Sequence, residues 1–156
     1  MLNIFLIAFL ILGTGFNAAI QAQETKAVVK DKTTKTKLLG KHPFSLQWIS
    51  WNHFGSSTVI ERRGVLRLNG KQKSRKDADF VTINGVITEI AKDEFKFDGK
   101  IVTKVSYINE GQECVREGEM TFKITGKRKY WRLQEMLNPC TNIKPIMLTF
   151  IFADFC

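Results

Sequence analysis

The chain has 156 residues, with 24 Lys or Arg against 15 Asp or Glu, and therefore a formal net charge of +9 at pH 7. This length allows one domain with its own core and is too short for two. The charge favours anionic partners. Only two histidines are present and no Cys-x-x-Cys occurs, so we expect no metal site and no cofactor.

The N-terminal segment, residues 1–22, has the layout of a signal peptide. An uncharged apolar run at residues 4–12 precedes small and polar residues around Ala18, Ala19 and Ala22. The run is too short to span a bilayer, which takes about 20 apolar residues. We therefore expect cleavage after Ala22, or alternatively after Ala19, and a periplasmic or secreted protein without a membrane span.

Residues 23–41, QETKAVVKDKTTKTKLLGK, are rich in Lys and Thr and carry few acids. Such a composition buries little apolar surface. We predict a flexible basic leader here, followed by a folded domain over residues 42–156.

The folded part alternates apolar and polar side chains with a period of two, which is typical of strands with one solvated face. In EFKFDGKIVTKVSY, which begins at Glu94, the apolar residues occupy odd positions and the charged ones most even positions. STVIERRGVLRLNG and EGEMTFKITG follow the same rule. No segment after residue 41 has a convincing helical period, so the sequence predicts an all-β fold.

An apolar-x-apolar-x-Gly pattern recurs at Gly70, Gly85, Gly99 and Gly126. The first three copies are 15 and 14 residues apart, which suits an antiparallel meander of about seven or eight strands. Glycines inside strands permit bends that curve a sheet, so we predict a closed or nearly closed lipocalin-like β-barrel. Two alternatives remain: an open sheet or sandwich, and glycines that mark turns, as in LNGKQ, INGV and ITGKRK.

The three cysteines fall in a chain expected to be exported, where a disulfide is the first interpretation of any pair. Cys114 and Cys140 lie inside the patterned region, and Cys156 is the last residue. We predict a Cys114–Cys140 disulfide that stabilises the fold by about 3 kcal/mol. The alternatives are that all the thiols are free or that Cys156 takes one partner.

FSLQWISW places a Trp on the expected first strand, and KYWRLQ places an Arg beside aromatics on a late strand. Over residues 44–137 this layout resembles the calycins, the lipocalin and avidin group of small exported barrels. The chain also resembles small exported bacterial proteins of unknown function. Lipocalins have Gly-x-Trp on the first strand, with the Trp under a late Arg or Lys; here Leu46 replaces the Gly, and Trp48 and Arg132 match the other two positions. The resemblance implies an apolar ligand in the barrel mouth.

The first functional hypothesis is accordingly a non-enzymatic binding protein that holds a small or amphiphilic ligand inside the barrel. We expect Trp48, Phe97, Trp131 and Arg132 to line that site.

The second hypothesis is an interaction module for anionic envelope polymers, since basic residues cluster in two patterned segments. Its candidate residues are Arg62, Arg63, Arg67 and the other cations up to residue 76, together with Lys127, Arg128 and Lys129. Single-stranded nucleic acid is a less expected partner of an exported protein. A basic surface that only promotes solubility is the plain alternative.

The third hypothesis is an unrecognised hydrolase, because NHFGSST places His53 near Ser56 and Ser57. No Gly-x-Ser-x-Gly elbow is present, and the other imidazole is His42. We therefore predict no catalytic residues.

The C-terminal segment from Ile143, IKPIMLTFIFADFC, contains an apolar run that does not alternate. We interpret it as a strand buried on both faces that closes the barrel. A lipid-facing strand and an atypical terminus are the alternatives.

Overall fold

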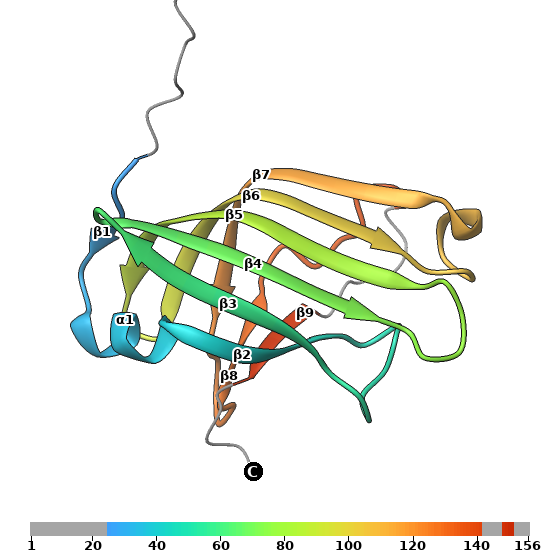
Figure 1. Ribbon diagram of the computed structural model, residues 1–156, viewed down its shortest axis with the longest axis horizontal. Coiled ribbons are helices and arrows are strands. Elements are labelled where there is room, and N and C mark those ends of the chain that lie inside the picture. The colour runs from blue at the N-terminus through green and yellow to red at the C-terminus, as the bar shows by residue number, and fades with distance from the viewer. Residues whose placement is uncertain (1–24, 142–147, 152–156) are drawn as a thin grey trace, which may run out of the picture.

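The computed structural model describes residues 25–141 and 148–151, and it is an antiparallel β-barrel (Figure 1). The expected signal peptide and Cys156 lie outside these residues. Eight strands close the barrel, because each pairs with the next along the chain and the last pairs with the first. They are β2 (Gly40–Leu46), β3 (Gly55–Arg62), β4 (Val65–Lys73), β5 (Phe80–Ala91), β6 (Glu94–Lys104), β7 (Glu113–Lys123), β8 (Tyr130–Leu133) and β9 (Leu148–Ile151). The predicted all-β barrel is confirmed.

The interior is a packed core in which aromatic rings predominate near one end. The rings of Phe95 and Phe122 stack with centroids 4.9 Å apart, and the Trp131 ring meets Phe95 edge to face at 5.7 Å. These side chains have at most 1% of their surface exposed.

On β4, β5, β6 and β7 the inward positions follow the predicted alternation. STVIERRGVLRLNG departs from it, because a turn at Arg63 and Gly64 divides the segment and leaves Val59 inside and Ile60 outside.

Two glycines of the apolar-x-apolar-x-Gly pattern lie where a side chain would not fit. Gly85 and Gly99 are direct cross-strand neighbours on β5 and β6. A Cβ at Gly99 would lie 2.6 Å from Cζ of Phe97, so glycine lets this ring lie against the strand backbone. Strand β5 runs through Gly85 and β4 through Gly70, so the turn interpretation was wrong for both. It was correct for Gly126, which has a φ of 62° in the β7–β8 connection.

The flexible-leader prediction was wrong for the described part of that segment. Residues of this segment form β1 (Val28–Val29), which pairs in parallel with β5, and helix α1 (Lys32–Leu38). Asp31 caps the helix by accepting a hydrogen bond from the Thr34 backbone N–H at 2.6 Å, and this bond lowers the pKa of the Asp31 carboxyl. Leu38 is 2% exposed and belongs to the core. A short basic helix is stabilised here by docking against the barrel, which composition alone does not reveal.

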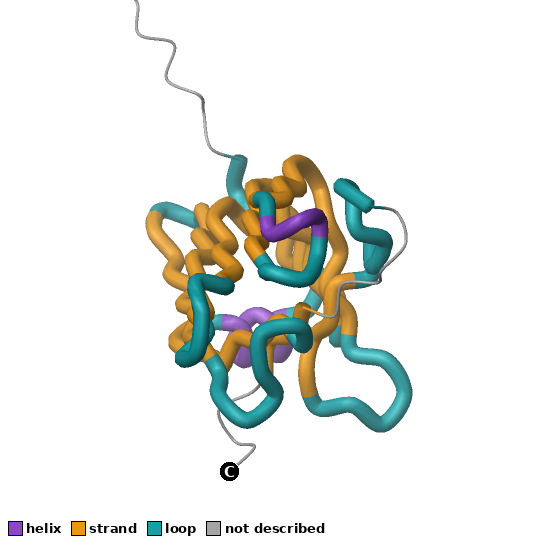
Figure 2. Tube along the Cα trace, turned by 90° about the vertical axis from the view of Figure 1, so that its right-hand side faces the viewer, coloured by secondary structure: helices purple, strands orange, loops and turns teal. Residues whose placement is uncertain are grey.

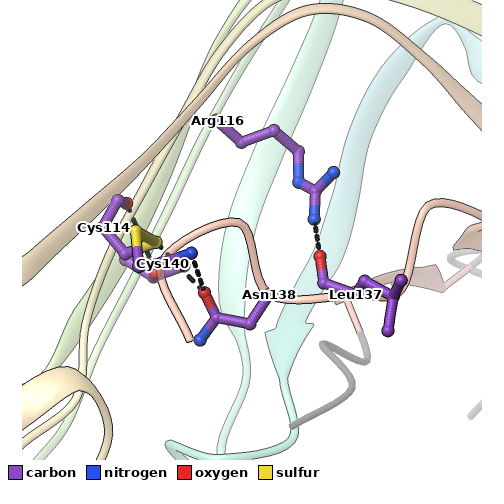
Figure 3. Close-up of a disulfide and its surroundings, with 6 residues drawn as sticks. Cys114, Arg116, Leu137, Asn138 and Cys140 are labelled. Carbon is purple, nitrogen blue, oxygen red and sulfur yellow. Dashed lines mark hydrogen bonds between the residues drawn. A yellow bond between two sulfur atoms is a disulfide. The ribbon is translucent and has the colours of Figure 1, made fainter. Parts of the chain in front are cut away.

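The Cys114–Cys140 disulfide is confirmed (Figure 3). It joins the beginning of β7 to the segment that follows β8. Asn138 on that segment is fully buried, and its Oδ1 accepts a hydrogen bond from the Cys140 N–H at 2.9 Å. Arg116 Nη2 donates to the Leu137 carbonyl.

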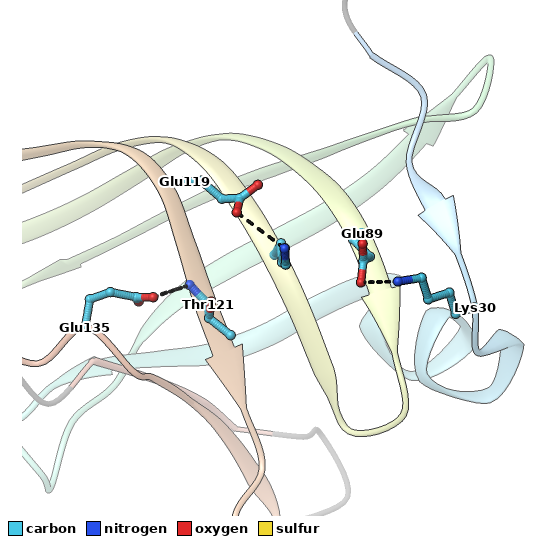
Figure 4. Close-up of polar contacts among 6 residues, drawn as sticks. Lys30, Glu89, Glu119, Thr121 and Glu135 are labelled. Atoms are coloured by element: carbon cyan, nitrogen blue, oxygen red, sulfur yellow. Dashed lines mark hydrogen bonds and ion pairs between the residues drawn. The ribbon is translucent and has the colours of Figure 1, made fainter.

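Strand β8 ends at Leu133. Beyond it the Gln134 N–H still donates to the Thr121 carbonyl at 2.9 Å, and the Glu135 carboxylate accepts the Thr121 N–H at 3.0 Å (Figure 4). Strand β9 then closes the barrel between β2 and β8, as predicted for the apolar segment. Leu148 and Thr149 are both buried, which agrees with a strand covered on both faces.

Candidate anion-binding end of the barrel

The connections of the meander divide the barrel into two ends. The β3–β4, β5–β6 and β7–β8 connections lie at the end that also carries α1 and β1; we call this the basic end. The β2–β3, β4–β5 and β6–β7 connections lie at the other end; we call this the loop end. Figure 1 shows α1 and β1 on the left, and Figure 2 looks onto the loop end.

Backbone contacts join the separate segments of the basic end. The Ala27 N–H donates to the Gly64 carbonyl at 3.2 Å, which links the N-terminal segment to the β3–β4 turn. The Asp93 N–H donates to Thr34 Oγ1 at 3.2 Å, which links α1 to the β5–β6 turn. The Ile124 N–H donates to the Asp93 carbonyl at 2.9 Å, which links this turn to the β7–β8 connection. The four segments therefore form one surface.

Cations outnumber acids on this surface. Its basic residues are Lys26, Lys30, Lys32, Lys35, Lys37, Lys41, Arg62, Arg63, Lys92, Lys123, Lys127, Arg128 and Lys129. Its acids are Asp31, Glu61, Glu89, Asp93 and Glu94.

Ion pairs already engage most of these acids. Lys30 lies 2.7 Å from Glu89 (Figure 4), Lys35 2.8 Å from Glu61, and Lys123 2.7 Å from Glu94. The Lys30 ammonium holds the pKa of the Glu89 carboxyl below its usual range. The remaining cations leave the basic end with a concentrated positive charge.

A hollow of ≈ 710 Å³ lies in the β7–β8 connection and is open to solvent. Its lining residues are Thr125, Gly126, Lys127, Arg128, Lys129 and Tyr130. Arg128 Nη1 donates to Thr125 Oγ1 at 2.6 Å and so holds the loop in shape. Among the described residues, no ion pair involves the three cations of this hollow. The site can accept sulfate, phosphate or carboxylate groups beside an aromatic ring.

The structure brings together only some of the cations predicted for an anionic surface, because those at residues 71–76 lie at the loop end. Arg62 and Arg63 lie at the β3–β4 turn, and residues 127–129 lie in the hollow. Arg67 is different, because it lies on the outer wall within β4, opposite Ile60 and Val86.

The residues predicted to line an internal ligand site are dispersed. Phe97 and Trp131 have no exposed surface and belong to the packed core. Trp48 lies in the turn after β2 and is half-buried. Arg132 is on β8, where its Nη2 lies 3.2 Å from Sδ of Met136.

Both histidines contact backbone carbonyls. His42 Nε2 lies 2.7 Å from the Leu38 oxygen, and His53 Nε2 lies 3.0 Å from the Lys73 oxygen. Ser57 Oγ donates to the main-chain oxygen of His42 and not to its ring. Within residues 25–141 and 148–151, no group of His, Cys, Asp and Glu has a metal-binding arrangement.

Two features of the molecule were not predicted from the sequence pattern. The lysines of residues 26–41 were expected in a flexible leader, whereas α1 and β1 place them beside the β3–β4 turn. Arg116 was not expected to be buried, and it is half-buried on β7 opposite the inward-facing Ile101. Burial lowers the pKa of the Arg116 guanidinium. The alternation in β7 was a usable signal, because Arg116 occupies the same parity as Met120.

Fold and surface thus define a small antiparallel β-barrel with one strongly basic end. In the part of the chain that the structure describes, no helix combines the length and apolar character needed to cross a bilayer. The chain belongs to the PM1083 family, whose model matches residues 26–147. It is 38% identical over 135 residues to "Uncharacterized protein PM1083" of Pasteurella multocida (strain Pm70), with 85% of this chain and 86% of that protein covered. No solved structure matches, so the resemblance to calycins stays a prediction.

Proposed function

We propose that the protein is an exported, non-enzymatic binding protein whose basic end holds an anionic polymer of the cell envelope, such as an acidic glycan or the phosphate-bearing part of lipopolysaccharide. The observation that supports this proposal most strongly is the meeting of cations from four chain segments at one end of the barrel. The disulfide is consistent with the oxidising compartment that export would provide.

The distribution of charge matters more than its total. Exposed charges act together when they lie within a Debye length, which is about 8 Å at physiological ionic strength. A polymer with repeated negative groups contacts several such cations at once, so weak individual contacts add up to useful avidity. A surface that serves only solubility needs no such concentration of charge at one end.

The hollow of the β7–β8 connection is the expected centre of binding. Lys127 and Lys129 are exposed, while hydrogen bonds from Arg128 join it to Thr125 on the other side of the loop. Tyr130 adds an aromatic wall, which suits the face of a sugar ring.

The test compares two double variants that remove the same charge. Lys127→Gln/Lys129→Gln changes the basic end, and Lys71→Gln/Lys76→Gln changes the loop end. Binding to dextran sulfate is measured by calorimetry, with uncharged dextran as the matched polymer. We expect the first variant to weaken binding about tenfold at low salt and the second to change it little.

Two outcomes would contradict the proposal. Equal weakening by both variants would show that net charge alone attracts the polymer. Affinity that does not fall as salt rises would show that the contact is not electrostatic.

A second candidate is binding of a small amphiphile at the loop-end mouth of the barrel, since the interior itself is packed, and Arg116 is the observation that favours it. This guanidinium is half-buried on the inner face of β7, and its Nε has no hydrogen-bond acceptor among the described residues. The carboxylate or phosphate of an amphiphile would satisfy it. Native mass spectrometry of protein purified from its own host should then show a retained mass that Arg116→Gln removes. Bare protein in both samples would reject this candidate.

A further inference from the structure

Hydrogen bonds from buried polar side chains hold together three of the connections at the loop end. Gln72 is 1% exposed, and its side chain hydrogen bonds to the Leu46 N–H at 2.7 Å and to the carbonyls of His53 at 2.9 Å and Ser50 at 3.4 Å. The β2–β3 loop, residues 47–54, is therefore held over the barrel by a buried amide. Burying an amide is favourable only when its hydrogen bonds are made, so this contact fixes the loop conformation.

Side-chain hydrogen bonds also join the other two connections to this loop. The buried Asp79 accepts the Ser106 N–H at 2.8 Å, which joins the β4–β5 connection to the β6–β7 connection. The Tyr107 hydroxyl donates to the Trp48 carbonyl at 2.7 Å, which joins the β6–β7 connection to the β2–β3 loop. Burial, together with Asp79 and Asp77, raises the pKa of Tyr107, so its hydroxyl remains a donor.

These connections present large aromatic side chains to solvent. Trp51 is 49% exposed, Phe54 is 43% exposed and Tyr107 is 59% exposed. Each aromatic belongs to a loop that side-chain hydrogen bonds hold in place. Aromatic groups exposed on such loops mark an interaction surface more strongly than scattered apolar residues do.

We propose that the loop end docks on the interface of an anionic phospholipid bilayer, with Trp51, Phe54 and Tyr107 inserted at the headgroup level. The proposal goes beyond polymer binding at the basic end. Trp and Tyr favour the membrane interface because each combines an apolar ring with a polar group.

Charge next to the aromatics favours lipid over a protein partner. The exposed Lys71, Lys73, Arg75 and Lys76 belong to β4 and its connection to β5. That region contacts the aromatic loop directly, since His53 hydrogen bonds to the Lys73 carbonyl. Cations that flank interfacial aromatics attract anionic headgroups. The acids Asp77 and Glu110 also lie on this end, so the aromatic insertion is expected to supply most of the affinity.

The test uses the mature protein and vesicles of phosphatidylethanolamine with phosphatidylglycerol, compared with vesicles of phosphatidylcholine alone. Trp51→Ala/Phe54→Ala should weaken co-flotation with the anionic vesicles about tenfold or more. Ile60→Ala, on the outer face of β3, removes a comparably exposed apolar side chain and should change nothing. Urea denaturation followed by far-ultraviolet circular dichroism reports whether each variant is folded.

A second readout locates the contact. Brominated lipids should quench tryptophan emission of the wild type, and Trp51→Phe should remove most of that quenching while vesicle binding persists. Trp131 has no exposed surface and should contribute none of it.

The outcomes also separate this inference from the proposed function. Lys127→Gln/Lys129→Gln should keep vesicle binding even though its polymer binding is weakened about tenfold. Vesicle binding lost in that variant alone, or unchanged in Trp51→Ala/Phe54→Ala, would overturn the inference. So would the absence of vesicle binding in the wild type, or a wild-type dimer that the aromatic variant converts to a monomer, because the loops would then dock a second copy of the chain.

Discussion

The two ends of the barrel are built by the same hairpin meander but differ in chemistry. At the basic end, α1 covers the aromatic core and leaves exposed lysines and arginines. At the loop end, buried Gln72 and Asp79 hold loops that carry exposed aromatics. One apolar core therefore runs the length of the barrel, whereas the connections at each end determine the chemistry of the surface there.

The largest expected effect comes from the core beneath the basic end. Trp131→Ala removes a fully buried ring in contact with Phe95 and should lower the free energy of unfolding by about 3–5 kcal/mol. Urea denaturation followed by far-ultraviolet circular dichroism measures it. A loss below 1 kcal/mol would mean that the aromatic core does not support this end.

Removing the disulfide tests the stability of the loop end. Cys114→Ser/Cys140→Ser opens a loop with a sequence separation of 26 and should cost about 3 kcal/mol. Hydrogen exchange should increase mainly around residues 113–116 and 134–141. Increased exchange in α1 instead would show that the two ends are not independent.

Gln72→Leu tests whether the two ends of the barrel bind their ligands independently. It keeps side-chain volume but leaves the His53 carbonyl and the Leu46 N–H without their partner, so stability should fall by about 1–3 kcal/mol. Vesicle binding should weaken, because the β2–β3 loop loses its fixed shape, while dextran sulfate binding should stay unchanged. Loss of polymer binding in this variant would contradict the assignment of that activity to the basic end.

The smallest effect concerns acid pH. The folded-state pKa values of Asp31 and Glu89 are lowered, by the Thr34 N–H and by Lys30 respectively. Their stabilisation is therefore present above the unfolded-state pKa of about 4 and is lost as pH falls through the folded-state values. Amide protection factors in β1 and α1 should fall below about pH 4, and less so in Glu89→Gln, which lacks one of these groups. The same acid response in the wild type and in Glu89→Gln would show that Glu89 does not contribute to it.

Much of the barrel could be predicted because alternation is a local signal. Inward residues such as Phe97 and Met120 follow directly from the period of two, and the disulfide follows from the position of Cys114 and Cys140. Helix α1 could not be predicted in this way, since only its docking through Leu38 stabilises a basic segment.

The candidate sites depend on which connections share an end of the barrel. The cations at residues 62–63 and 127–129 were identifiable, but their juxtaposition with α1 requires the strand order. The hydrogen bonds of Gln72 could not be predicted either, because the sequence does not indicate that three backbone groups contact this strand residue.

Lysine acetylation footprinting by mass spectrometry, with and without dextran sulfate, tests the central claim most directly because it reads both ends in one sample. The account predicts protection of Lys92, Lys127 and Lys129 at the basic end, with Lys71 and Lys76 at the loop end unchanged. Equal protection at both ends, or protection at the loop end alone, would contradict it.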